Sequence, residues 1–319
     1  MRHPPPLSIT AFYDTRPGHV KQTRGLIQAL KEFTPVQVKE VFLPDYTAWR
    51  IVRDWARFIT ILPGKKQAGP PEPALILGTG THTHIPMLLH RHKKTGTAVT
   101  CMTPGWPLTK FMDLCFIPEH DAPKADNHIV ATLGPPNTAV NRHTHDPLQG
   151  LIVLGGIDRK THHWDNDKIM VQVRKIIEKQ PHMFWTLSTS PRTPCEMVPM
   201  LVDLTRHICG TTVVPFEDTH PGWIETQYDK ASAVWVSADS VSMVYEALTA
   251  GCRVGILSVD WKKKGRRLAR GIDILAQKKK IIYFETFMKH TAYPAHSQLN
   301  EARRCAREML KRWWPNRLQ

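Results

Sequence analysis

The chain has 319 residues, 41% of them hydrophobic, and a formal net charge of +15 at pH 7. This length predicts two domains rather than one, and the charge predicts an anionic partner: a nucleic acid, an acidic membrane surface or a phosphorylated ligand. Six scattered cysteines without a CxxC pair predict reduced thiols in a cytosolic protein. No signal-peptide core or membrane-spanning apolar run is found, so we expect neither secretion by that route nor a transmembrane segment.

Apolar and amphipathic segments alternate along the first half of the chain. The segments predicted to be strands are 8–14, 36–43, 74–80, 98–102, 114–118 and 128–134, and the predicted helices are 23–33, 49–62 and 84–96. The basic segment "TRPGHVKQ" (15–22) is predicted to be a loop. Such alternation is typical of a parallel sheet with helices on both faces.

A proline-rich polar segment, 135–148, interrupts this alternation and predicts a linker. Strands are then predicted within 150–159, 182–194, 211–217, 233–239 and 253–259, with a helix from about Asp165. We therefore predict an α/β protein of two doubly wound Rossmann-like domains facing a cleft, with boundaries at 1–147 and 148–295. The remaining segment, 296–319, is predicted to be a basic helix that either returns to the first domain or contacts a membrane.

Polar residues and glycines follow five of the predicted strands, where ligands bind in such sheets. In the first half, which is predicted to be the acceptor side, they are Arg16, Gly18, His19, Gly78, Thr79, Gly80, Thr81 and His82. In the second half, predicted to bind the donor, they are Gly155, Gly156, Arg159, Ser188, Ser190, Arg192, Asp239, Ser240, Ser242 and Glu246.

The segment "SADSVSMVYEALTAG" (237–251) joins a helix start to four small polar residues and a glutamate. A capping box would need Glu or Gln three residues after Ser240, but that position is Met243. Ser242 and Glu246 are four residues apart and share a helix face. Because a helix N-terminus favours anions, we predict that this turn, Met243 included, binds a pyrophosphate and that Glu246 binds a ribose. The alternative is a solvated glutamate on a surface helix.

Two more loops carry residues suited to phosphate. "LGGIDR" (154–159) places two glycines after a strand and adds Arg159, and "STSPRTP" (188–194) offers three hydroxyl groups before Arg192. The alternatives are a tight turn for the glycines and helix caps for the serines and threonines. Neither loop matches GxGxxG, and nor does "GTGTHTH" (78–84), so no nicotinamide cofactor is predicted.

The wider pattern resembles a known family. The matching segments are "DTRPGHVKQTRGL", "GTGTHTHIPMLL", "PEHD", "GPPN", "LGGIDR", "STSPRTP" and "VSADSVSMVYEAL", which together resemble the mitochondrial fission protein family named from plants. Its bacterial members are regarded as GT-B glycosyltransferases. The resemblance covers roughly residues 8–275 and implies a GT-B fold. The site of better understood GT-B enzymes implies that Ser240, Ser242 and Glu246 bind a nucleotide sugar.

The resemblance also implies a catalytic base in the first domain. "PGHV" (17–20) is similar to the "GGHV" loop of the bacterial peptidoglycan N-acetylglucosamine transferase, with Pro17 in place of one glycine. We predict His19 as the base because the ordinary pKa of histidine lies near the operating pH. Asp121 in "PEHD" and His82 are alternative bases, and His120 belongs to the acceptor side. His19 could instead bind the acceptor or cap the next helix.

Short histidine clusters at 81–84, 143–145 and 161–163 lack the ligand spacing of a zinc site, so no metal is predicted. GT-B enzymes generally need none, since helix dipoles and basic side chains stabilise the leaving nucleotide diphosphate. No other cofactor is predicted, and the nucleotide sugar is a substrate.

The segment 49–62 is predicted to be an amphipathic helix. Val52, Trp55, Ile59 and Leu62 share one face, and Arg50, Arg53 and Arg57 share another. This pattern fits either a helix packed on the core with a solvated basic side or a contact with an anionic membrane. The basic segment 300–314 has the same character.

The predicted function is therefore a glycosyltransferase with a nucleotide-sugar donor and a lipid-linked or lipopolysaccharide-type saccharide acceptor. We expect it in the cytoplasm, peripherally bound to the inner membrane. Two alternatives are a non-catalytic GT-B-like adaptor at a membrane and a nucleotide-sugar epimerase. No nucleic-acid-binding motif is found, so nucleic acid is not predicted as a partner.

Overall fold

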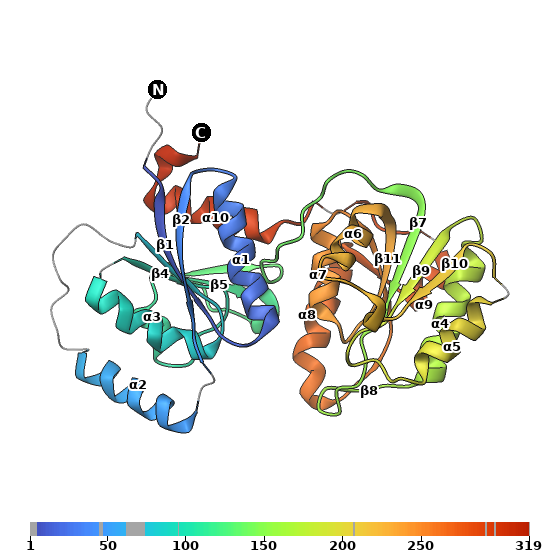
Figure 1. Cartoon of the computed structure of the whole chain (residues 1–319), viewed down its shortest axis with the longest axis horizontal. Helices are drawn as coiled ribbons and strands as arrows, with labels where there is room; N and C mark the ends of the chain where they lie inside the picture. Colours follow the sequence, from blue (N-terminus) through green and yellow to red (C-terminus); the bar gives the residue numbers. More distant parts are fainter. Residues whose placement is uncertain are drawn as a thin grey trace. The chain divides into compact units, whose positions relative to one another are not determined.

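The computed structural model describes residues 5–44, 47–61, 74–94, 96–206, 208–290, 292–296 and 298–318. They form two compact units (Figure 1). Unit 1 comprises Met1–Thr138 with Asn300–Gln319, and unit 2 comprises Ala139–Leu299. Each unit contains a six-stranded sheet whose strands pair in parallel, with helices packed on it. The predicted class, two Rossmann-like α/β domains of the GT-B type, is confirmed.

The sheet of unit 1 has the strand order β2-β1-β3-β4-β5-β6. Its strands are β1 (Leu7–Tyr13), β2 (Val36–Phe42), β3 (Leu75–Gly78), β4 (Thr97–Thr100), β5 (Leu114–Pro118) and β6 (Ile129–Thr132). Its helices are α1 (Pro17–Lys31), α2 (Ala48–Ile61), α3 (Thr81–Lys94) and α10 (Glu301–Trp313). The order reverses between β1 and β3, which makes this pair the switch point where ligands bind in open α/β sheets.

Side chains of β1 alternate between two apolar layers because successive strand residues point to opposite faces. Ile9, Ala11 and Tyr13 belong to the layer that also contains residues of α1 and α10. Phe12 belongs to the opposite layer, with residues of α2 and α3. Burial on both faces explains why these strands read as nearly continuous apolar runs.

The C-terminal helix α10 packs against α1 (Figure 1). Cys305, Met309 and Leu310 are buried in the same layer as β1. Arg303 forms an ion pair with Glu32 at 3.0 Å. Asn300 caps the helix by accepting a hydrogen bond from the Arg303 N–H.

The sheet of unit 2 has the strand order β10-β9-β7-β11-β12-β14. Its strands are β7 (Asp146–Val153), β9 (Phe184–Ser188), β10 (Thr211–Val214), β11 (Ala231–Ser237), β12 (Arg253–Leu257) and β14 (Ile281–Tyr283). Its helices are α4 (Asn166–Lys179), α5 (Met197–Thr205), α6 (Trp223–Lys230), α7 (Val241–Thr249), α8 (Arg266–Gln277) and α9 (Phe284–His290). A small antiparallel pair, β8 (His162–His163) and β13 (Asp260–Trp261), is added. Numbered along the chain, the six parallel strands follow the order 3-2-1-4-5-6, so the switch point lies between β7 and β11.

Several element boundaries differ from those predicted. The predicted loop 15–22 is helical from Pro17 onward, because proline fits the first position of a helix. Helix α3 begins at Thr81 rather than at residue 84. The domain boundary predicted at 147/148 lies inside β7, and the division between the two units falls after Thr138.

Within the described part of the chain, no helix is both long and apolar enough to cross a membrane.

Candidate functional sites at the two switch points

The switch point of unit 1 brings together most of the predicted acceptor-side residues. Arg16, Gly18 and His19 follow β1, and Gly78, Thr79, Gly80, Thr81 and His82 end β3 or begin α3. Thr23 and Thr79 join the two sides through a buried hydrogen bond of 3.1 Å between their hydroxyl groups. Gly18 and His19 lie in the first turn of α1, not in a loop as predicted.

The central feature of this switch point is a pair of side chains, Asp14 and His19. The Asp14 carboxylate is buried, and its Oδ2 lies 2.6 Å from His19 Nδ1. Its Oδ1 accepts a hydrogen bond from the Arg16 N–H at 3.1 Å, which fixes the carboxylate. Since an ionised carboxylate can only accept, Nδ1 of His19 donates the hydrogen bond and Nε2 remains able to take a proton.

Gly80 permits this pair to form. Its φ of +112° is a backbone conformation that residues with a side chain rarely adopt. A Cβ at this position would also overlap the Asp14 carboxylate and lie 2.5 Å from His19 Nδ1. Glycine is therefore required here by both the backbone and the dyad.

The predicted alternative base, Asp121, lies elsewhere on the sheet. It ends a short 3-10 turn, Glu119–Asp121, which follows β5, and β4 separates β5 from β3. Asp121 accepts a hydrogen bond from the Thr103 hydroxyl at 2.9 Å and lies 3.3 Å from His120 Nε2. His120 and Asp121 therefore form a cluster at the end of β5, two strands from β3 along the sheet.

A buried histidine that was not predicted lies beside the dyad. His84 in α3 is fully buried, and its Nε2 lies 3.1 Å from the Thr100 hydroxyl. Burial lowers the pKa of His84 to about 4, and the charge of nearby His19 adds to this effect. His84 is therefore neutral at physiological pH.

This shifted pKa predicts an acid-sensitive fold. In the unfolded chain His84 binds a proton near pH 6.5, but in the folded protein only near pH 4. The unfolded state therefore binds more protons between these values, and His84 lowers the free energy of unfolding by up to about 3 kcal/mol as the pH falls from 6.5 to about 4. Denaturant unfolding across this range should show the loss, and His84→Gln should remove that part of it. An unchanged pH dependence in the variant would assign the acid sensitivity to other groups.

The switch point of unit 2 is formed by the ends of β7 and β11. Gly155 and Gly156 follow β7, and their N–H groups donate to the Ser237 hydroxyl at 2.7 Å and to Asp239 Oδ2 at 3.1 Å. A Cβ at Gly156 would overlap the Arg192 carbonyl, so this glycine permits a close approach of two backbones. The glycine loop is therefore held by neighbouring loops of the protein.

The loop after β9 secures the glycine loop from the other side. The Ser190 hydroxyl donates to the Gly155 carbonyl at 2.8 Å, and the Thr193 hydroxyl donates to the Leu154 carbonyl at 3.1 Å. Ser188 is buried at the end of β9, and its carbonyl accepts from the Leu154 N–H at 2.9 Å. Thr193 was not predicted as a site residue, although it lies in the same "STSPRTP" segment.

An arginine–carboxylate pair lies at the start of α7. Arg192 Nη2 donates to Asp239 Oδ2 at 2.8 Å and to the Ser240 hydroxyl at 3.3 Å. Asp239 is buried, and its Oδ1 has no hydrogen-bond partner among the described residues. The N-cap residue Ser240 makes no side-chain cap bond, so the first N–H groups of α7 are left for another acceptor.

Glu246 is buried, with 7% of its surface exposed, which rules out the alternative of a solvated surface glutamate. Burial and then the charge of Glu246 raise the pKa of Tyr228 well above its usual value. Ser242 is exposed and Met243 half-buried in the turn before Glu246. Arg159 is exposed on the glycine loop, where its carbonyl accepts from Lys262 at 2.9 Å.

A buried histidine beside the glycine loop was also not predicted. His162 Nε2 lies 2.9 Å from the Gly156 carbonyl, and its ring packs edge-on against Trp164 and Trp261. His162 therefore positions the glycine loop. Among the described residues, no group of three or more His, Cys, Asp or Glu side chains is placed to hold a metal ion.

The fold is shared with several solved structures. A protein from Listeria monocytogenes named as a UDP-N-acetylglucosamine 2-epimerase aligns over 97% of this chain and 97% of its own, with 15% identity and a TM-score of 0.55. The UDP-GlcNAc 2-epimerase of Neisseria meningitidis, bound to UDP-GlcNAc, aligns over 95% of this chain and 100% of its own, with 11% identity and a TM-score of 0.54. The UDP-GlcNAc 2-epimerase of Methanocaldococcus jannaschii aligns over 95% of this chain and 99% of its own, with 11% identity and a TM-score of 0.53. At these identities the similarity establishes the fold alone.

No curated protein matches the sequence. A family model does match, over residues 17–313, and it describes mitochondrial fission ELM1. This match spans both units and confirms the resemblance drawn from the motifs: the chain belongs to the mitochondrial fission ELM1 family.

Proposed function

We propose that this protein is a GT-B glycosyltransferase that transfers a sugar from a nucleotide-sugar donor to a lipid-linked or lipopolysaccharide-type acceptor. The observation that carries the proposal is the start of α7. There an uncapped helix N-terminus, the Arg192 guanidinium and the buried Glu246 carboxylate belong to one switch point. We place the protein in the cytoplasm, at the surface of the inner membrane.

The donor would bind with its diphosphate at the start of α7. The helix N–H groups and Arg192 suit phosphate oxygens, and Arg192 keeps donors beyond the bonds it makes to Asp239 and Ser240. A ribose has two hydroxyl groups, and each can donate a hydrogen bond to a carboxylate such as that of Glu246. These groups would also stabilise the leaving diphosphate, so we propose that no metal is required.

The acceptor hydroxyl would be activated in unit 1. His19 Nε2 would take its proton as the hydroxyl oxygen attacks the anomeric carbon and the bond from sugar to phosphate breaks. Asp14 would hold the imidazole and stabilise the imidazolium that forms, since its carboxylate lies 2.6 Å from Nδ1. Both residues lie at the β1–β3 switch point.

Glu246→Ala tests the donor site. The variant should bind a nucleotide sugar more weakly by about 1–3 kcal/mol, the scale of a lost hydrogen bond to a charged group. A panel of nucleotide sugars is titrated against thermal stability, because a ligand that binds the folded state raises it. The matched control is Glu178→Ala, which removes a carboxylate from α4 of the same unit.

The same titration, joined to an assay of nucleotide-sugar conversion without acceptor, separates the alternatives. Unchanged affinity of Glu246→Ala for every nucleotide that the wild type binds would contradict the ribose contact. Conversion of a nucleotide sugar without any acceptor would identify an epimerase. Failure of the wild type to bind any nucleotide sugar would favour an adaptor.

A further inference from the structure

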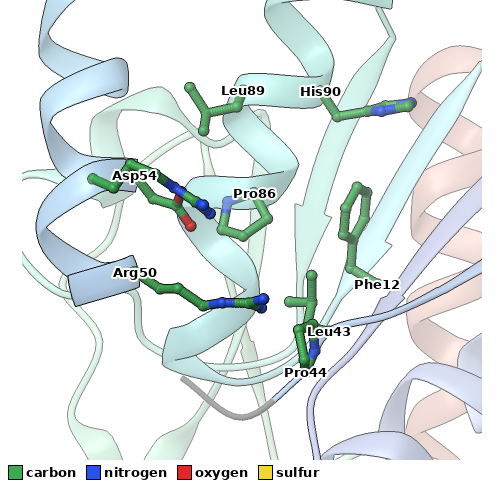
Figure 2. A pocket seen from close by; sticks show the side chains of 9 residues that line it. Phe12, Leu43, Pro44, Arg50, Asp54, Pro86, Leu89 and His90 are labelled. Atoms are coloured by element: carbon green, nitrogen blue, oxygen red, sulfur yellow. The ribbon is translucent and has the colours of Figure 1, made fainter. Parts of the chain in front are cut away.

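Unit 1 contains a cavity of about 300 Å³ that neither switch point explains. It lies between α2, α3 and the segment that follows β2 (Figure 2). Phe12, Leu43 and Leu89 form an apolar wall, while Arg50, Arg53 and Asp54 of α2 supply charged groups. The cavity therefore offers both apolar surface and charge to a ligand.

The charges in this cavity do not balance. Arg53 donates from Nε and Nη2 to Asp54 Oδ1 at 3.2 and 3.1 Å, and Asp54 is only 7% exposed. This pair neutralises itself. Arg50 has no hydrogen-bond or ion-pair partner among the described residues, and its side chain reaches across the cavity toward Leu43 and Pro44 (Figure 2). One uncompensated guanidinium therefore faces an apolar wall.

A guanidinium binds planar or tetrahedral oxyanions through paired N–H groups, and phosphate fits this geometry. The apolar wall would add affinity only for a ligand with a hydrocarbon part. Exposed apolar side chains on another face of α2 favour a ligand from a membrane: Trp49 is 73%, Val52 60% and Ile59 59% exposed. The ligand that satisfies all three features is a lipid with a phosphate ester.

We propose that this cavity binds the phosphate end of a lipid, with Arg50 on the phosphate and the first part of the apolar chain against Phe12, Leu43 and Leu89. The inference rests on the proposed function in one respect, namely that the lipid is the part of the acceptor to which the saccharide is linked. Two sources share this chemistry, a glycerolipid and an isoprenoid carrier.

The experiment measures binding of water-soluble probes by calorimetry below their micelle concentration. The probes are dihexanoyl phosphatidic acid, farnesyl phosphate and inorganic phosphate. Arg50→Gln should weaken binding of a lipid phosphate about 10- to 100-fold, and inorganic phosphate should bind more weakly than either lipid. Whichever lipid binds more tightly identifies the source.

The matched control is Arg57→Gln. This variant removes one charge from the same helix, but Arg57 does not line the cavity. The affinity of the variant for a lipid phosphate should therefore stay within about twofold of wild type. Equal losses in both variants would show unspecific attraction and overturn the proposal, as would equal affinity for inorganic phosphate. Leu43→Trp, which fills the cavity without changing charge, should also abolish binding.

This test is independent of the donor site. Glu246→Ala should bind the lipid probes as the wild type does. If the wild type binds a nucleotide sugar but none of the lipid probes, the cavity assignment alone is overturned. If it binds a lipid probe but no nucleotide sugar, the proposed function alone is overturned.

Discussion

Replacing His19 by alanine is expected to lower kcat by about 10²–10⁴-fold while the affinity for the donor stays near that of wild type. The reason is the geometry at the β1–β3 switch point. Asp14 holds Nδ1 of the imidazole at 2.6 Å, which leaves Nε2 for the role of base proposed above. Steady-state kinetics with a nucleotide sugar that binds, together with separate titration of the donor, would measure both quantities.

Two companion variants make the result specific. Asp14→Asn keeps the size of the side chain but loses the charge that stabilises the imidazolium, so kcat should also fall. Asp121→Ala should leave turnover near normal, because Asp121 lies after β5 with His120. Near-normal turnover in His19→Ala with a large loss in Asp121→Ala would assign the base to the aspartate.

The triple variant Trp49→Ser, Val52→Ser, Ile59→Ser is expected to bind anionic vesicles about 10²–10³-fold more weakly than wild type. These three side chains form an exposed apolar stripe on α2, and Arg53, one helical turn after Trp49, lies beside it. An apolar stripe bordered by arginines suits the boundary between acyl chains and anionic headgroups. Flotation with vesicles at low and high salt would measure the binding, and salt should weaken it.

The control uses exposed apolar residues of unit 2. Val171→Ser, Phe184→Ser, Val202→Ser changes side chains that are 50%, 51% and 42% exposed and should leave vesicle binding unchanged. Equal loss in both triple variants would exclude α2 as the specific contact. Reversing the charge at position 53 with Arg53→Glu is a poorer test, because the new glutamate would lie beside the buried Asp54 carboxylate.

The periodicity of α2 was predicted, but its orientation was not. The sequence places Val52, Trp55 and Ile59 on one face, yet in the structure Val52 and Ile59 are exposed. Among the described side chains of α2, Phe58 and Asp54 are the buried ones, and Phe58 belongs to the apolar layer that α3 also lines. A hydrophobic period identifies the faces of a helix, but when two faces carry apolar residues only tertiary packing decides which one is covered. The predicted member Leu62 lies outside the described residues.

The strand ends were easier to predict than the bonds made there. Alternation of apolar and amphipathic segments predicts a parallel sheet, and with it the edge where polar residues collect. The pair Arg192 and Asp239 is 47 positions apart in the chain, so only the sheet order brings the two together. Asp14 could have been found, because it is a charged residue at the end of a strand and five residues before His19.

The path of the chain through unit 1 has a consequence for synthesis. Because α10 fills one apolar layer of this unit, the unit is built from both ends of the chain and unit 2 is an insertion within it. On the ribosome, the continuous stretch that forms unit 2 is translated before α10, so unit 2 can begin to fold before unit 1 is complete. The first sheet, although translated earlier, has α1 on this face but keeps the part that α10 covers exposed until α10 leaves the exit tunnel. A chaperone that shields apolar surface on nascent chains would find its substrate there.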